Sequence, residues 1–189
     1  MQRKSKDGLV ASIPLYALGA IFLVPLSIGV LLVSSNAIQY EHANQISRDA
    51  GSMYAQGLDF SKRANQNIAL RVAEGLGMQE GQGVLILSKI RVVQDADCRA
   101  QAQRECVNRG RAVIAQRYVI GNATLRRSSL GTPANVNAAS GEVMNWASDT
   151  SARAQDISAS LRPGEFAYVA ECYVTSPEHR SGVYARAVF

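Results

Sequence analysis

The hydrophobic pattern of the chain begins with a uniformly apolar segment. No charged side chain occurs between Asp7 and Glu41, where most residues are Leu, Val, Ile, Ala or Gly. About 20 apolar residues span a bilayer as a helix, and a helix satisfies its own backbone hydrogen bonds, as lipid requires. The pattern therefore predicts a transmembrane helix over residues 9–35, preceded by a short basic N-terminus at residues 1–8.

The basic residues on either side of this segment predict its orientation. Arg3, Lys4 and Lys6 precede it, whereas the first basic residue after it is Arg48. The positive-inside rule then places the N-terminus in the cytoplasm and the rest of the chain in the periplasm or outside the cell. A cleaved signal peptide is the alternative, because small residues follow at 34–37. The apolar core of a signal peptide is normally only about 7 to 15 residues long, which is clearly shorter than the apolar segment of this chain.

Beyond the apolar segment the pattern becomes that of an amphipathic helix. We expect a helical stem over residues 36–80, with a second helix from Ser61 to Leu76 and Gly77 as its stop. The stem either packs on the chain's own domain or meets a helix of a partner protein. Its small and apolar positions recur at alternating three- and four-residue steps, and they are Ala43, Ile46, Ala50, Met53 and Gly57.

Residues 81–189 change to a period of two, which is typical of strands. A connection containing Pro177 and Gly182 makes the last two strands a hairpin. Amphipathic helices would cover one face of such a sheet, so the predicted fold class is α+β, with the stem packed on a roughly four-stranded antiparallel sheet. The predicted strands are Gly83–Val93, Ala112–Ile120, Glu165–Thr175 and Val183–Phe189.

The alternation also predicts which side chains share a face. In the second strand, Ile114, Tyr118 and Ile120 fall on one side. Between the second and third strands, residues 122–163 are rich in Ser, Asn, Ala and Gly. They predict a long loop with one short helix near 150–161, and a loop of this length is a candidate partner surface. In the first strand the predicted apolar face is formed by Val84, Ile86, Ile90 and Val92, opposite Lys89 and Arg91.

Length and charge narrow the class of protein. About 150 residues follow the apolar segment, which fits a single domain. The net charge is +5, and removing the three basic residues and Asp7 of the N-terminus leaves +3. So small and scattered a charge gives no reason to expect a nucleic-acid partner.

The cysteines predict one disulfide. In an oxidising compartment Cys98 and Cys106 are expected to pair, and closing a loop of about nine residues stabilises the fold by about 2.5 kcal/mol. A continuous helix would separate their Cα atoms by about 12 Å, so a turn between them is required. A metal site is the alternative use of these sulfurs, but the histidines, His42 and His179, are distant. Cys172 is expected to be a buried free thiol.

The chain carries no sequence motif of a known catalytic site. It has no Gly-x-Ser-x-Gly elbow, no phosphate-binding loop and no His-Glu-x-x-His pair, so we expect neither an enzyme nor a cofactor. An acidic partner is the alternative to solvation for the clustered arginines, which are Arg104, Arg109, Arg111, Arg126 and Arg127.

The layout resembles that of TadE/TadG-like proteins, minor pilin or pseudopilin components of bacterial Tad (Flp-type) pilus systems. The resemblance runs over nearly the whole chain and includes residues 83–90, 113–122 and 182–189. It implies processing by a prepilin peptidase between Gly8 and Leu9. Members of the family often carry Glu five residues after such a glycine, but this chain has Ile13 there, which favours an uncleaved protein held in the inner membrane.

The resemblance implies a non-catalytic assembly component, either a minor pilin-like subunit or a scaffold. Its expected partners are the membrane and other pilin-like or Tad secretion components, contacted through the N-terminal helix and the stem. Two alternatives remain open, which are a structural filament subunit that forms homo-oligomers and an anchored periplasmic binding or sensor domain, including an anchored hydrolase.

Overall fold

The computed structural model describes residues 7–100, 106–157, 161–176 and 179–189. Contacts within the chain divide it into two units, Met1–Gln39 and Tyr40–Phe189. The second unit holds both the amphipathic helices and the sheet. Helix α1, Asp7–Ala55, contributes residues to both units.

Within the described residues, no helix has the length and apolar character that crossing a membrane requires. The transmembrane segment at residues 9–35 stays a prediction.

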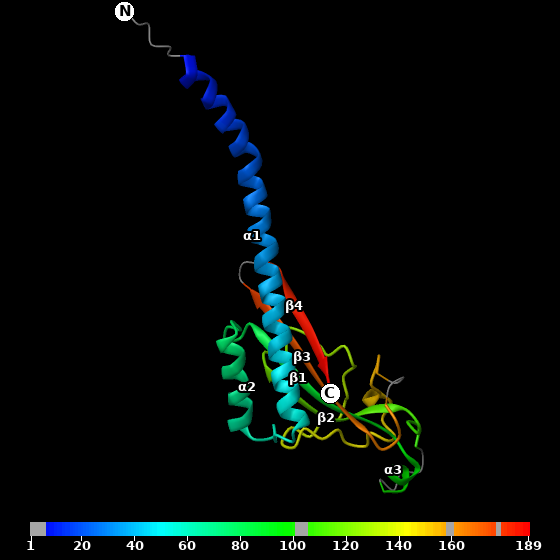
Figure 1. Ribbon diagram of the computed structural model, residues 1–189. Helices are drawn as coiled ribbons and strands as arrows, with labels where there is room; N and C mark the ends of the chain where they lie inside the picture. Colours follow the sequence, from blue (N-terminus) through cyan, green and yellow to red (C-terminus); the bar gives the residue numbers. More distant parts are fainter. Residues whose placement is uncertain (1–6, 101–105, 158–160, 177–178) are drawn as a thin grey trace, which may run out of the picture. The chain divides into compact units, whose positions relative to one another are not determined.

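The second unit is an α+β domain with a four-stranded antiparallel sheet (Figure 1). The strand order is β2-β1-β3-β4, so β1 and β3 are central. The predicted fold class is confirmed at this level, although β4 begins at His179 rather than Val183. The strands are β1 (Gly83–Val92), β2 (Ala112–Gly121), β3 (Phe166–Ser176) and β4 (His179–Val188), and the remaining helices are α2 (Arg63–Gly75), α3 (Asp95–Ala100) and the 3-10 turn η1 (Thr150–Ala152).

A glycine in the left-handed conformation follows the last turn of each long helix. At the end of α1, Gly57 has φ +90°, its N–H bonds the Tyr54 carbonyl at 3.0 Å, and the Leu58 N–H bonds the Met53 carbonyl at 3.0 Å. This pair of bonds is a Schellman motif, and α2 ends with the same motif at Gly77. Gly77 is thus confirmed as a stop. Gly57 is not a position on the helical stripe, because it terminates the helix.

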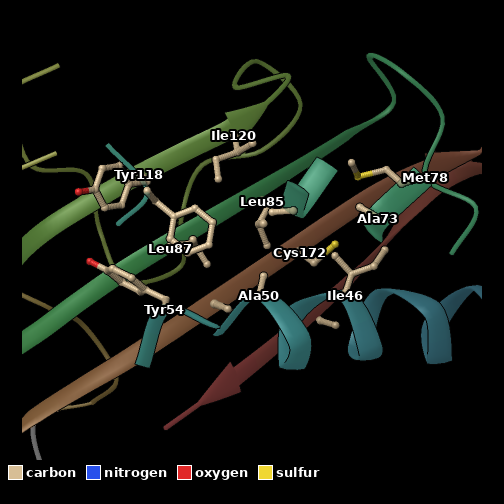
Figure 2. Close-up of a cluster of buried hydrophobic side chains, with 14 of the residues drawn as sticks. Ile46, Ala50, Tyr54, Ala73, Met78, Leu85, Leu87, Tyr118, Ile120 and Cys172 are labelled. Atoms are coloured by element: carbon tan, nitrogen blue, oxygen red, sulfur yellow. The ribbon is translucent and has the colours of Figure 1, made fainter. Parts of the chain in front are cut away.

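One face of the sheet packs on the helices (Figure 2). The later residues of α1 lie against the central strands, and α2 completes the layer. Leu85 and Leu87 of β1 are 1% and 0% exposed on this face. The buried cluster consists of Ala43, Ile46, Ala50, Tyr54, Phe60, Ala69, Ala73, Met78, Leu85, Leu87, Tyr118, Ile120, Ala170, Cys172 and Ala185.

The other face of the sheet is also buried. It is covered by the segment between β2 and β3, described at residues 122–157 and 161–165 and called the covering segment below. The irregular backbone of this segment contributes apolar side chains to a second cluster. This second core was not expected from a pattern that predicted half-buried strands. Its members are Ile90, Val93, Cys98, Ala112, Val113, Ile114, Leu130, Val143, Ala147, Ala152, Ala154, Ile157, Ala167 and Val169.

A bulge in β2 changes the predicted face of one residue. Lys89 is paired with Gln116 but the next residue, Ile90, is paired with Ile114, so Ala115 is an extra residue. An extra residue reverses the alternation beyond it. Ile114 therefore belongs to the second cluster and not to the helix face with Tyr118, as the simple alternation predicted.

The covering segment forms less helix than predicted. Among its described residues only those of η1 are helical, and the Ala154 N–H then bonds the Ala112 carbonyl at 3.0 Å while Arg153 bridges Val113. Pairing with β2 uses backbone groups that a helix would need, and Asp156 has φ +62°. The predicted helix over 150–161 is thus wrong beyond Ala152 within the residues described.

Candidate functional site

The apolar part of α1 exposes large hydrophobic side chains. Two of its serines bond the backbone of their own helix, because Ser27 Oγ donates to the Leu23 carbonyl at 2.7 Å and Ser34 Oγ to the Val30 carbonyl at 2.8 Å. Such a surface favours an apolar environment. The exposed residues include Ile21, Phe22, Leu23, Val24, Leu26, Ile28, Val30, Leu31 and Val33.

The possible processing site lies at the start of the same helix. Gly8 and Leu9 belong to the first turn of α1. The side chains of residues 7–19, including Ile13, lie outside those that the structure describes, so processing there remains a prediction.

The stem residues are used inside the domain. Ala43, Ile46 and Ala50 are 0%, 2% and 2% exposed and belong to the helix-face core, and Met53 is half-buried against it. Of the two interpretations, packing on the chain's own sheet is the arrangement observed. While the domain is folded, these three side chains present no surface to a second molecule.

Aromatic side chains fix the end of α1 on the sheet. The ring of Tyr54 meets those of Phe60, Tyr118 and Tyr168 edge-on, with centroids 5.8, 5.9 and 5.1 Å away. Its hydroxyl donates to Gln116 Oε1 at 2.9 Å. Burial raises the pKa of Tyr54 far above its ordinary value, so this hydroxyl remains a neutral donor.

A buried charge network joins the opposite face of the sheet to the covering segment. Arg117 of β2 and Glu171 of β3 are 6% and 2% exposed. Arg117 donates through Nε to Ser88 Oγ at 3.2 Å, through Nη2 to Ser128 Oγ at 3.0 Å, and through Nη1 to the Gly131 carbonyl. Desolvation lowers the pKa of Arg117 to about 10, opposed by the charge of Glu171. The guanidinium thus stays charged at neutral pH.

The carboxylate of Glu171 receives the other end of this network. It accepts hydrogen bonds from Ser128 Oγ, from the Ser129 N–H and Oγ at 2.8 Å each, and from Tyr184 Oη at 2.8 Å. These bonds occupy the four or so acceptor sites of a carboxylate. Ser128 therefore connects the two charges, and the network fastens a loop instead of presenting a free base or nucleophile.

Sequence reasoning missed this network. The available signal was a charged residue in the middle of each of two mostly apolar strands, Arg117 in β2 and Glu171 in β3. The alternation of a half-buried strand does not distinguish a solvated charge from a buried one. Only the covering segment, which turns that face into an interior, makes the pair recognisable.

The predicted disulfide is confirmed. Cys98 and Cys106 are bonded with their Cα atoms 5.6 Å apart, within the range that a disulfide requires. Cys172 is a buried free thiol, as expected. Burial raises its pKa to about 12, which keeps it protonated and unreactive near neutral pH.

A buried asparagine organises the covering segment near the disulfide. Asn108 is 0% exposed, and its Nδ2 donates to the carbonyls of Trp146 at 2.8 Å and Asp149 at 2.7 Å. Its Oδ1 accepts from Arg153 Nε at 2.8 Å. One side chain thus holds three parts of an irregular segment together.

The clustered arginines differ in their surroundings. Arg126 lies 4.2 Å above the ring of Tyr184 and so is not simply solvated. Arg104 lies outside the described residues. The remaining three are exposed, and they are Arg109, Arg111 and Arg127.

Across the described ranges, no three His, Cys, Asp or Glu side chains gather in a way that could hold a metal ion. The chain matches no protein-family profile, no curated protein and no solved structure. The pilin-like architecture, an N-terminal helix packed on a four-stranded antiparallel sheet, is recognised from the arrangement of elements.

Proposed function

We propose that this chain is a non-catalytic, membrane-anchored component of a Tad (Flp-type) pilus assembly system, either a minor pilin-like subunit or a scaffold. The observation that carries the proposal is the dual character of α1. Residues 21–33 expose a run of large apolar side chains, whereas Ala43, Ile46 and Ala50 are core residues of a pilin-like domain. One helix can thus hold a folded domain and engage lipid or other helices.

Two independent features support the proposed compartment. The Cys98–Cys106 disulfide favours an extracytoplasmic domain. The basic residues before the apolar segment, Arg3, Lys4 and Lys6, favour a cytoplasmic N-terminus. Together they support a single pass through a bacterial inner membrane.

A filament subunit is the second candidate, because the same exposed apolar side chains would suit helix packing in a filament core. That role fits processing between Gly8 and Leu9. In the family that the layout resembles, a Glu near this site is thought to pair with a neighbouring N-terminal amine inside the filament core. Ile13 stands at that position, which favours the anchored component.

Fractionation tests the anchor in the native cells. We expect the wild-type chain to stay with the membrane after a carbonate wash. The double variant Leu23→Arg/Leu31→Arg should be released, because each arginine in a membrane helix costs about 2.5 to 3.5 kcal/mol. Ile68→Arg is the matched control, since Ile68 is a similarly exposed apolar residue on α2, and it should stay bound. A soluble wild-type chain, or equal behaviour of the two variants, contradicts the anchor.

Mass spectrometry of the native N-terminus separates the candidates. An intact Met1 supports the anchored component, and a start at Leu9 supports a processed filament subunit. A start near Ile38 means that a signal peptide has been removed, and it rejects both.

Cross-linking tests the assembly role itself. A photoreactive residue at Phe22, which is 72% exposed, is expected to form an adduct with a different pilin-like or secretion chain. Adducts mainly with a second copy of the chain would favour the filament subunit. The control is the same residue at Ile68. Equal adducts at both positions, or no protein adduct at Phe22, contradict assembly through α1.

A further inference from the structure

A cavity of about 850 Å³ lies between the turn that leads into β2, the backbone around Gly131 and the turn η1. Most of the described residues that line it are polar or charged, and its surface mixes polar and apolar atoms. The lining residues are Arg109, Gly110, Arg111, Ala112, Gly131, Thr132, Thr150, Ser151, Arg153, Ala154 and Gln155.

The walls of this cavity are held by the fold. The Ala154 N–H bonds the Ala112 carbonyl and the Gln155 N–H bonds the Leu130 carbonyl, each at 3.0 Å. The Cys98–Cys106 disulfide closes the loop that precedes the arginine-bearing turn. A cavity with fixed walls binds a ligand without first ordering its own backbone.

Arg153 is held in place by a buried partner. Its Nε donates to Asn108 Oδ1 at 2.8 Å and its Nη2 to the Val107 carbonyl at 3.3 Å, while Asn108 is itself 0% exposed. These bonds use two of the five N–H donors of a guanidinium. The remaining donors sit on a fork whose orientation is set by the protein.

Two further arginines add to the charge. Arg109 Nε lies 3.0 Å from Asp95 Oδ1, and the two side chains are 64% and 66% exposed, so this ion pair is weak and readily exchanged. Arg111 is exposed and has no ion-pair partner among the described residues. Among the described residues that line the cavity, none carries a carboxylate side chain.

We propose that this cavity binds an acidic saccharide through its carboxylate groups. Guanidinium forks match carboxylates in shape and charge. Thr132, Thr150 and Gln155 offer hydroxyl and amide groups of the kind that bond sugar hydroxyls, and the volume lies within the range of about 300 to 1,000 Å³ found for small-ligand sites. The inference does not depend on the proposed assembly role, and neither fails with the other.

Calorimetry on the full chain, purified in a detergent without a sugar headgroup, tests the proposal with three probes. Trigalacturonate is expected to bind saturably, and less tightly as the salt concentration rises. Maltotriose, a neutral trisaccharide, is expected not to bind. Inorganic phosphate is expected to compete weakly. No binding of trigalacturonate, equal binding of maltotriose, or phosphate binding as tight as that of trigalacturonate overturns the assignment.

Matched variants locate the site. Arg111→Gln is expected to weaken trigalacturonate binding about tenfold, because a hydrogen-bonded charge contact is lost. Arg127→Gln removes the same charge from an exposed position outside the cavity, and its effect should stay within about twofold. Equal losses would mean diffuse surface attraction and would reject the site.

A third variant is expected to act in the opposite direction. Asp95→Asn removes the carboxylate that competes for Arg109, so trigalacturonate should bind more tightly. Weaker binding by a variant that unfolds at the wild-type temperature contradicts the proposed role of Arg109. Thermal unfolding of each variant separates lost binding from lost folding.

Discussion

Gly51 of α1 packs closely against Phe189 and Ala170. A Cβ built there would lie 2.4 Å from Cε2 of Phe189 and 3.0 Å from Cβ of Ala170. Glycine in a helix interior normally costs stability relative to alanine. Here the missing side chain permits the close packing of helix and sheet, so the local cost is offset by tertiary contact.

We expect Gly51→Val to destabilise the domain by about 2 kcal/mol, because the added methyl groups overfill this contact. Urea unfolding of the full chain, followed by the fluorescence of Trp146, its single tryptophan, measures the change. Gly75→Val is the control, since nothing lies within 4 Å of a Cβ at that position, and its change should stay below about 0.5 kcal/mol. Equal destabilisation by the two variants would contradict the close contact.

The covering segment is an element without regular secondary structure, and a charge network holds its first part. Arg117 and Glu171 come from β2 and β3, the two strands that flank β1, and they bond the backbone or side chains of Ser128, Ser129 and Gly131. Burying the two charges removes their hydration. That cost is offset only while both charges and their hydrogen-bond partners are present. The network therefore specifies where the segment lies over the sheet.

A double-mutant cycle tests this coupling. Arg117→Met and Glu171→Leu are each expected to cost about 3 to 5 kcal/mol, because each leaves a buried charge uncompensated. The double variant should cost less than the sum of the two, by at least about 1 kcal/mol. Arg127→Met, at an exposed position, should change the free energy of unfolding by less than about 0.5 kcal/mol. Strict additivity of the two single changes would show that the charges act independently.

On the scale of the whole domain, one sheet carries two cores. β1 contributes to both, since Leu85 and Leu87 lie in the helix-face cluster and Ile90 in the second one. Both clusters pack on the same strands. Opening either face of the sheet therefore exposes strands on which the other cluster also packs. This sharing predicts a single cooperative transition for the domain.

Large-to-small changes in the two cores should therefore shift the same transition. Ile46→Ala on the helix face and Leu130→Ala on the opposite face remove side chains that are 2% and 0% exposed, and each should cost about 2 to 5 kcal/mol. Far-UV circular dichroism and Trp146 fluorescence should give coincident curves for both variants. If Leu130→Ala shifts the fluorescence change but leaves the helical signal in place, the two faces unfold separately.

The burial of Ile46 also limits what its substitution can report. A charged residue at this position, as in Ile46→Asp, would disrupt the core. Any loss of partner binding by that variant would therefore be indistinguishable from unfolding of the domain. The exposed positions on α1, such as Phe22, are the ones that test a partner surface.

Local rules were enough where a pattern has one physical solution. The four strands, the second helix with its stop at Gly77, and the Cys98–Cys106 pairing were all predicted, because period, glycine chemistry and loop length act between near neighbours in the chain. The same rules placed Ile114 on the wrong face. The bulge in β2 adds one unpaired residue and reverses the face of every position beyond it, and the sequence pattern does not show where such a bulge lies.

The sequence by itself determined the four strands, helix α2, the α+β class and the apolar character of the N-terminal segment, since each depends on the spacing of side chains within one element. Only the tertiary structure decided that both faces of the sheet are interior, that Arg117 and Glu171 meet through Ser128, and that Arg109, Arg111 and Arg153 surround one cavity. These arrangements join residues far apart in the chain through an irregular segment, whose path is set by packing and buried hydrogen bonds and leaves no periodic signal in the sequence.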